Sequence, residues 1–231
     1  MMDSSYIDSD QGQSAVDKDS SQTKRVNGVA SAAKVEKEIH PAADNETIDR
    51  MAFHLEAIMQ TLQLRPEHET THQTSLRVAK YFLHDLLRGL NPAYKPDIQV
   101  LPNQGQAGQM VLERNVSFRS YCQRYFVPFT GKAHIAYYPN ENTIDSSGLH
   151  DLVDFLARKP HTRERLTEEI AVKMARYLRT DDVAIILEAE HFGIEDGKAS
   201  GPTNSSVTSS YKGCFQQKLY KEEFLFSVQN Q

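Results

Sequence analysis

The chain has 231 residues, of which 39% are hydrophobic and 25% are charged, and its formal net charge is −5. This composition is typical of a globular protein, and the acidic balance argues against a nucleic-acid binder, which usually carries a basic excess. No apolar stretch reaches the roughly 18 residues of a membrane span, and the N-terminus lacks the pattern of a secretory signal. Two cysteines, Cys122 and Cys214, cannot form a disulfide framework. We therefore expect a cytoplasmic protein without nucleic-acid or membrane partners.

The first 92 residues divide into two regions of different composition. Residues 1–45 are rich in Ser, Asp, Gln and Lys and have few large apolar residues. Such a segment buries too little surface to offset its ordering entropy, so we predict a disordered polar tail. From Glu46, apolar residues recur at three- and four-residue spacing, and a second amphipathic run covers residues 75–90. We predict an N-terminal helical region over residues 46–92.

The rest of the chain, residues 93–231, mixes helical and strand patterns. Residues 91–109 contain three prolines and two glycines and are typical of a loop. The predicted strands cover residues 110–122, 131–139, 182–192 and 205–215. The predicted helices cover residues 148–159, 162–179 and 221–228. This order indicates an α+β domain in which antiparallel strand pairs flank a pair of helices.

Several segments at matching spacing resemble the GTP cyclohydrolase I family. They are GKAHIAYYPN, LVDFLARKPHTRERLTEEIA, AEH, a Ser/Thr-rich strand that ends in GCF, and EEFL, and together they span about residues 50–228. The resemblance implies the tunnelling fold, an antiparallel four-stranded sheet with two helices on one face. It also implies a toroid of subunits with substrates at subunit interfaces. Family members convert GTP and water to dihydroneopterin triphosphate and formate, with a zinc ion held by Cys, His and Cys.

The zinc ligands of the family are mostly replaced in this chain. Where the family has Cys-Glu-His-His, residues 122–125 read Cys-Gln-Arg-Tyr, and where it has His-x-Cys, residues 191–193 read His-Phe-Gly. One protein ligand of three, Cys122, survives, and Arg124 is a permanent cation near the metal position. A rearranged site built from Cys122 and His191 lacks a visible third ligand. Because a catalytic zinc takes three protein ligands, we expect no ordinary zinc binding and no other cofactor.

The residues that grip the triphosphate in the family are also replaced. Ser147 stands at the family's serine, but the following Lys is Gly148 and the nearby Arg is Asp151. The later family Arg falls on Gly197, and the neighbouring Lys198 is a partial substitute whose side chain points to the other face of a strand. A triphosphate would therefore lose the charge-assisted hydrogen bonds that hold it.

Two candidate site residues survive. Glu164 matches the family glutamate that accepts hydrogen bonds from guanine, although a solvated carboxylate in an i,i+4 array explains it equally well. His191 matches the catalytic histidine, with a partly buried structural histidine as the alternative. We expect His134 to be structural, and His150 and His161 to lie on the surface.

Three functions remain open at this stage. The first is a degenerate paralogue that binds a purine or pterin, or regulates an active copy, as a homo- or hetero-oligomeric ring. The second is an enzyme of altered mechanism with Cys122 as nucleophile, with Arg124 nearby to favour the thiolate. The third is residual GTP cyclohydrolase activity, which the loss of both zinc ligands and phosphate cations disfavours.

Overall fold

The computed structural model describes residues 41–64, 70–105, 108–195 and 198–230. The predicted tail therefore lies outside the described residues, except for residues 41–45, which belong to the first helix. The helices are α1 (Pro41–Thr61), α2 (Thr71–Tyr81), α3 (Ser146–Ala157), α4 (Arg163–Leu178) and α5 (Lys218–Gln229). The strands are β1 (Val100–Pro102), β2 (Val111–Cys122), β3 (Pro128–Tyr137), β4 (Asn142–Ile144), β5 (Pro160–His161), β6 (Val183–Glu195) and β7 (Lys198–Tyr211).

The two N-terminal helices pack against each other through a small apolar cluster around Ile48, Ala52 and Ala79. Thr70 begins α2 with a capping box, in which its hydroxyl accepts from Gln73 N and the Gln73 side chain accepts from Thr70 N. The single helix predicted over residues 75–90 is wrong in its second half, because α2 gives way to a π-helical turn at Phe82–Leu86 and a 3-10 turn at Arg88–Leu90. This segment is tied to the end of α3, where Gly89 N donates to Arg158 O at 3.0 Å.

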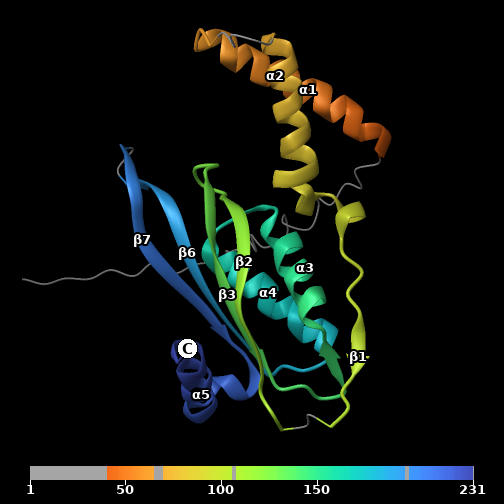
Figure 1. Cartoon of the computed structure of the whole chain (residues 1–231), viewed down its shortest axis with the longest axis vertical. Helices are drawn as coiled ribbons and strands as arrows, with labels where there is room; N and C mark the ends of the chain where they lie inside the picture. The colour runs from red at the N-terminus through yellow and green to blue at the C-terminus, as the bar shows by residue number, and fades with distance from the viewer. Residues whose placement is uncertain (1–40, 65–69, 106–107, 196–197, 231) are drawn as a thin grey trace, which may run out of the picture. The chain divides into compact units, whose positions relative to one another are not determined.

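The main sheet has the strand order β5-β2-β3-β6-β7. Its four long strands pair antiparallel, and the two-residue β5 pairs parallel with the end of β2. Helices α3 and α4 lie on one face of this sheet (Figure 1). The α+β tunnelling fold is thus confirmed, with β5 as an addition to the expected four strands. The loop predicted over residues 91–109 contains one short strand, β1, which pairs with β4 in a small separate sheet.

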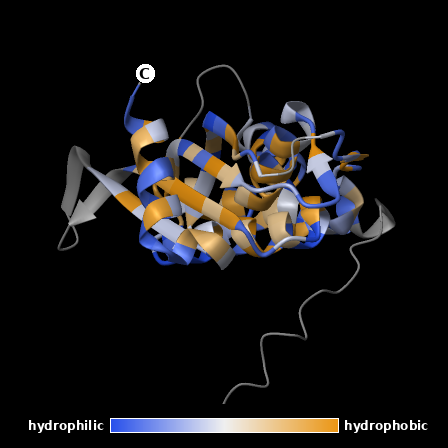
Figure 2. Cartoon of the chain, turned by 90° about the horizontal axis from the view of Figure 1, so that it is seen from below, coloured by the Kyte–Doolittle hydropathy of each residue, from blue (hydrophilic) through white to orange (hydrophobic). Residues whose placement is uncertain are grey.

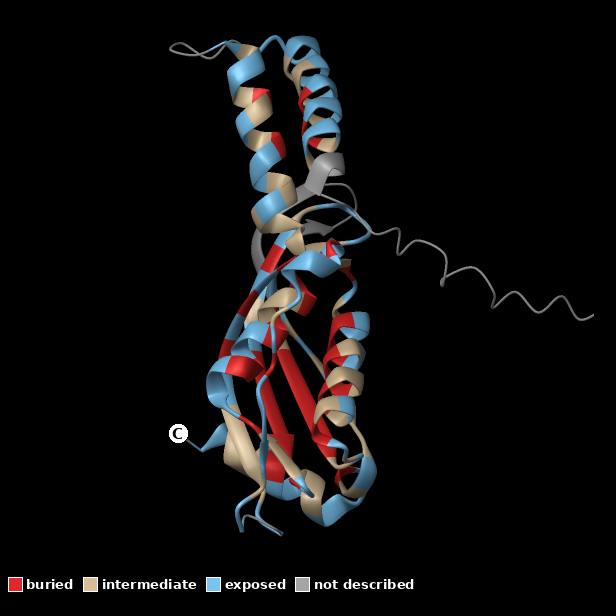
Figure 3. Cartoon of the chain, turned by 90° about the vertical axis from the view of Figure 1, so that its right-hand side faces the viewer, coloured by how far each residue is buried: buried red, intermediate tan, exposed pale blue. Residues whose placement is uncertain are grey.

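The main core lies between the sheet and the two helices. Every second residue of β3 and β6 points into it, and the inner sides of α3 and α4 supply its other half (Figure 3). Hydrophobic residues concentrate in these strands and in the helices packed on them (Figure 2). A smaller cluster on the opposite face joins Ala136, Ala184 and Ile186 to Phe215 and Phe224, so α5 covers only part of that face.

The predicted strand over residues 205–215 ends earlier than its pattern suggests. β7 stops at Tyr211, and Gly213–Gln216 form a 3-10 turn that begins with Gly213 at φ +55°. A glycine adopts this left-handed conformation without steric cost, which is why the chain turns here into α5. No helix among the described residues is long and apolar enough to cross a membrane.

Candidate functional site

Cys122 ends β2 and begins a tight turn. Its amide N donates to Val127 O at 2.8 Å, and Phe126 N donates to Cys122 O at 2.8 Å. Its side chain is partly buried and packs against the main core. The backbone of the turn is therefore held by its own hydrogen bonds, and the thiol faces apolar neighbours.

The turn itself is aromatic and exposed. Phe126 adopts φ +55°, and its ring stacks on Phe82 with centroids 6.0 Å apart and lies 5.6 Å from the Tyr121 ring. Gln123, Arg124 and Tyr125 are exposed. The positions where the family carries histidines are thus occupied by residues that face solvent.

His161 is buried, which corrects the expectation that it lies on the surface. Its backbone pairs with Cys122 in β5, so its side chain falls beneath the end of the sheet, where it is 3% exposed. Its Nε2 donates to Leu156 O at 3.1 Å and lies 3.4 Å from Glu169 Oε2. Burial lowers the pKa of this imidazole below its ordinary value and so favours the neutral ring. His150, by contrast, is exposed as expected.

His191 lies at the same end of the sheet as Cys122. Its Cα is paired with that of Phe129, and Phe129 is paired with Ser120, so two strand spacings, or roughly 10 Å, separate the backbones of β6 and β2 here. Further along the pair of strands β6 and β7, Glu195 of β6 pairs with Lys198 at the start of β7. The side chains of His191 and Lys198, and the whole of Gly197, lie outside the described part of the chain.

Glu164 stands in the first turn of α4, which Thr162 caps by accepting from Arg165 N at 3.3 Å. It is exposed. The helix start lies beside the Cys122 turn, because Gln123 N donates to His161 O at 3.0 Å. Cys122, Glu164 and the backbone of His191 are thus at one end of the sheet.

The start of α3 brings a capping carboxylate close to Gly148, the position of the family's lysine. Asp145 caps the helix by accepting from Gly148 N at 3.2 Å, and its other carboxylate oxygen accepts from the Ser147 hydroxyl at 2.8 Å. A Cβ at Gly148 would lie 2.7 Å from Asp145 Oδ1. A side chain there would displace the capping carboxylate, so this helix start is built around glycine. Asp151, one turn further, is exposed.

The two parts of the expected site are far apart in one chain. Ser146 donates to Glu113 Oε1 at 3.0 Å, which places the start of α3 beside the first residues of β2. Cys122 is the last residue of the same strand. At about 3.3 Å per residue, roughly 30 Å of strand separates the two positions. A single chain therefore does not bring Ser147 to Cys122, Glu164 and His191.

The residues around Cys122 do not fit a catalytic zinc. Such a site needs three protein ligands, and the turn offers one thiol beside an arginine and a tyrosine. The nearest imidazole along the strand pairing, His161, directs Nε2 to Leu156 and Glu169. In the part of the chain that the structure describes, no three His, Cys, Asp or Glu side chains form a ligand group. Cys214 is no alternative nucleophile, because burial and Asp182 raise the pKa of its thiol to about 12.

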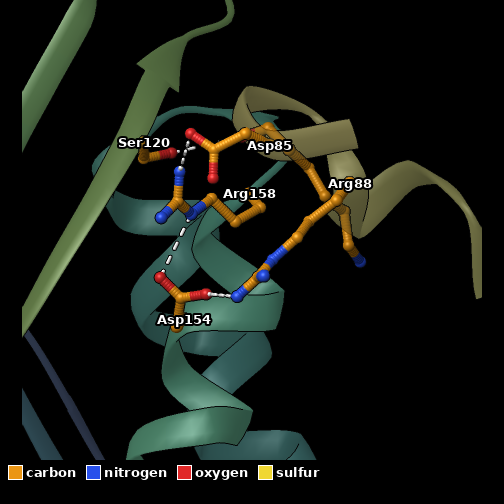
Figure 4. A network of polar contacts seen from close by, with 6 residues as sticks. Asp85, Arg88, Ser120, Asp154 and Arg158 are labelled. Atoms are coloured by element: carbon orange, nitrogen blue, oxygen red, sulfur yellow. Dashed lines mark hydrogen bonds and ion pairs between the residues drawn. The ribbon is translucent and has the colours of Figure 1, made fainter. Parts of the chain in front are cut away.

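A second polar cluster, which our sequence analysis missed, joins α3 to the segment after α2 (Figure 4). Arg158, 5% exposed, donates from Nε to Asp154 Oδ1 at 3.1 Å, and its Nη1 lies 3.4 Å from Asp85 Oδ2. Asp154 also accepts from Arg88. Opposite charges alternate through the cluster, so each buried charge has a partner. The i,i+4 spacing of Asp154 and Arg158 was the one signal in the sequence.

An antiparallel sheet with two helices on one face, pairing in this order, defines the tunnelling-fold class. The family model described as GTP cyclohydrolase I matches residues 51–229. GTP cyclohydrolase 1 of Flavobacterium johnsoniae is 33% identical over 182 residues, 79% of this chain and 82% of that protein. The Haemophilus influenzae protein of the same name is 32% identical over 188 residues, 81% of this chain and 86% of that protein. For Aeromonas hydrophila GTP cyclohydrolase 1 the identity is 34% over 178 residues, 77% of this chain and 82% of that protein. The chain belongs to the GTP cyclohydrolase I family.

Proposed function

We propose that this chain is a GTP cyclohydrolase I-like protein without ordinary zinc-dependent turnover. It acts as a purine- or pterin-binding, or regulatory, subunit of a ring in the cytoplasm. The observation that carries the proposal is the donor set at Cys122, where one thiol is surrounded by an exposed aromatic turn and by a histidine already bonded elsewhere. Without a bound metal to activate water, the hydrolytic step of the family loses its largest source of transition-state stabilisation.

The helix start at Asp145–Gly148 supports the same conclusion. It presents a capping carboxylate and a glycine where the family carries a phosphate-binding lysine. A triphosphate near this helix would meet Asp145 and Asp151 and no cation at those positions. The charge-assisted bonds that hold phosphate groups would be replaced by repulsion.

Assembly into a ring is supported by the distance between the two parts of the site. Because the α3 start and Cys122 lie at opposite ends of β2, a complete pocket needs the α3 start of one subunit beside the Cys122 end of another. The neighbour is a second copy of this chain or an active paralogue. Glu164 stays exposed at the start of α4, where it is accessible to a purine.

A nucleophilic role for Cys122 has weaker support. Its side chain packs against the main core, and Arg124, the cation expected to favour its thiolate, is exposed in the turn. A partly buried cysteine of this kind behaves as a small apolar residue. We therefore propose a structural role for this thiol.

Turnover of GTP in the presence of zinc tests the proposal. The chain would be purified from a host without its own cyclohydrolase, with the Haemophilus influenzae relative as positive control, and product would be followed by neopterin fluorescence. We expect no product above the protein-free rate, while GTP or a pterin still binds and Glu164→Gln weakens that binding about tenfold. Turnover that zinc chelation abolishes would overturn the proposal.

A further inference from the structure

A pocket lies beside β2, β3, β6 and β7, and most of its lining residues alternate along the strands with residues of the main core. The pocket has a volume of about 580 Å³, within the usual range for small-molecule sites. The strand residues that line it include Ser117, Arg119, Thr130, Lys132, Glu188, Glu190 and Ser205. Arg119 precedes Cys122 by three positions on β2, so their side chains point to opposite faces of the strand, and the start of α3 lies near the other end of β2.

The positively and negatively charged residues that line this pocket from the sheet lie on different strands. Two rows of facing residues cross the sheet: Arg119, Thr130 and Glu190 form one, and Ser117, Lys132 and Glu188 form the other. Both cations therefore come from β2 and β3, and both carboxylates come from β6. Asp154 borders the pocket from α3, but its carboxylate is already bound by Arg88 and Arg158.

These charges are not used within the described structure. Among the described residues, the exposed side chains of Arg119, Lys132 and Glu190 have no hydrogen bond or ion pair. Lys132 and Glu188 face each other directly, yet their charged groups do not meet, and Glu188 instead lies 3.8 Å from His134 Nε2. Arg119 and Glu190 are two strand spacings apart, roughly 10 Å between their backbones, with Thr130 between them.

His134 is a further polar side chain in this region, with the Glu188 carboxylate 3.8 Å from its Nε2. It stands next to this pocket on the same sheet face, two positions after Lys132, and is 4% exposed. Neither of its ring nitrogens has a hydrogen-bond partner among the described residues. Buried polar groups in native proteins are nearly always satisfied by protein, water or ligand.

We propose that this pocket binds a small zwitterion of the α-amino acid class. The carboxylate of the ligand would bind Arg119 and Lys132, and its ammonium group would bind Glu188 and Glu190, with Ser117, Thr130 and Ser205 as further hydrogen-bonding groups. Two cations and two anions give the strand walls no net charge. A polyanion such as GTP gains nothing there, so this site is not a second triphosphate site.

Binding of amino acids to the full-length chain tests this proposal. Each common L-amino acid would be added at the same millimolar concentration and its effect on the melting temperature measured, and calorimetry would then give Kd for any that raise it. Each amino acid found to bind would be compared with its N-acetyl derivative, which lacks the ammonium group, and with its amide, which lacks the carboxylate. We expect at least one amino acid to bind, and both derivatives to bind at least about tenfold more weakly.

Variants of the pocket connect that binding to these residues. Lys132→Gln and Glu188→Gln should each raise Kd about tenfold, since each removes one charge-assisted bond. Glu190→Gln replaces Glu188→Gln if the latter does not fold. Lys218→Gln is the matched control, because Lys218 belongs to an exposed pair with Glu222 on α5. The proposal is overturned if no amino acid binds, if the N-acetyl derivative binds equally well, or if the pocket variants bind like the control. None of these outcomes depends on GTP turnover.

Discussion

Two regions of the same domain differ in burial and in residue type. One is the core between the sheet and helices α3 and α4, and the other is the turn at residues 122–127. In the core, residues such as Leu187 and Ile170 are fully buried, on the inner sides of β6 and α4. In the turn, Tyr125 and Phe126 are about half exposed, and Cys122 is the one residue there with a thiol ligand for a metal. The difference supports our proposal that the scaffold persists without the zinc chemistry of the family.

The largest effect should come from a cavity in the core. Leu187→Ala should lower the free energy of unfolding by about 3 kcal/mol, because it removes a fully buried side chain from the centre of the sheet. Tyr125→Ala in the exposed turn should change it by about 0.5 kcal/mol or less. Urea unfolding of both variants measures the difference. Equal losses would show that the turn is as strongly constrained as the core.

A smaller loss is expected from the charge cluster that joins the core to the segment after α2. Asp154→Ala should lower the free energy of unfolding by about 2 kcal/mol, because it leaves the buried Arg158 with only the longer contact to Asp85. Asp151→Ala, an exposed change on the same helix, is the control. A loss no greater than that of the control would mean that the cluster contributes nothing to stability.

Restoring the family's lysine at the start of α3 tests whether this helix start tolerates a side chain at position 148. Gly148→Lys should cost about 1 kcal/mol, since the new Cβ displaces the Asp145 carboxylate from its capping position. Asp151→Arg restores the other cation at an exposed position and should cost about 0.5 kcal/mol or less. Thermal unfolding compares the two. A Gly148→Lys variant as stable as the parent would show that this helix start is still compatible with the family's phosphate site.

The smallest effect concerns pH. The pKa of His161 is lowered by burial, so the folded state holds this ring neutral and the unfolded chain takes up the proton first as pH falls. The neutral ring contributes fully to the free energy of unfolding above about pH 6.5, which is the pKa of histidine in the unfolded chain. This contribution is lost as the pH falls below that value. His161→Gln should therefore reduce the loss of stability between pH 7.5 and 5.5. His150→Gln, on the exposed side of α3, should leave that loss unchanged, and an identical profile for all three proteins would contradict the assignment.

The fold could be predicted from the sequence because the periodicity of apolar residues and the spacing of motifs indicate it. The alternation in residues 131–139 and the helical spacing in residues 162–179 predict β3 and α4 closely. β1 was missed, because a three-residue strand surrounded by prolines exists only through its pairing with β4. The prediction that the last strand continues through residues 212–215 was wrong, because Gly213 turns the chain there.

The candidate site was less accessible for a physical reason. A sequence comparison aligns His191, Ser147 and Cys122 with one family site, but it gives no distance between them, and Cys122 and Ser147 lie at opposite ends of β2. His161 carries no signal of burial, because its environment comes from Leu156 and Glu169 on two helices. The pocket at Arg119 and Lys132 was missed because charges on alternate strand positions are also the ordinary pattern of a solvated face.

The zinc content of the purified chain tests the central claim most directly. After dialysis against zinc and then against metal-free buffer, zinc per chain would be measured for the parent, for Cys122→Ala and for the control Cys214→Ala. The loss of the family's ligands predicts far less than one zinc per chain in all three, with no decrease on replacing Cys122. Close to one zinc per chain in the parent and in Cys214→Ala, lost in Cys122→Ala, would contradict it.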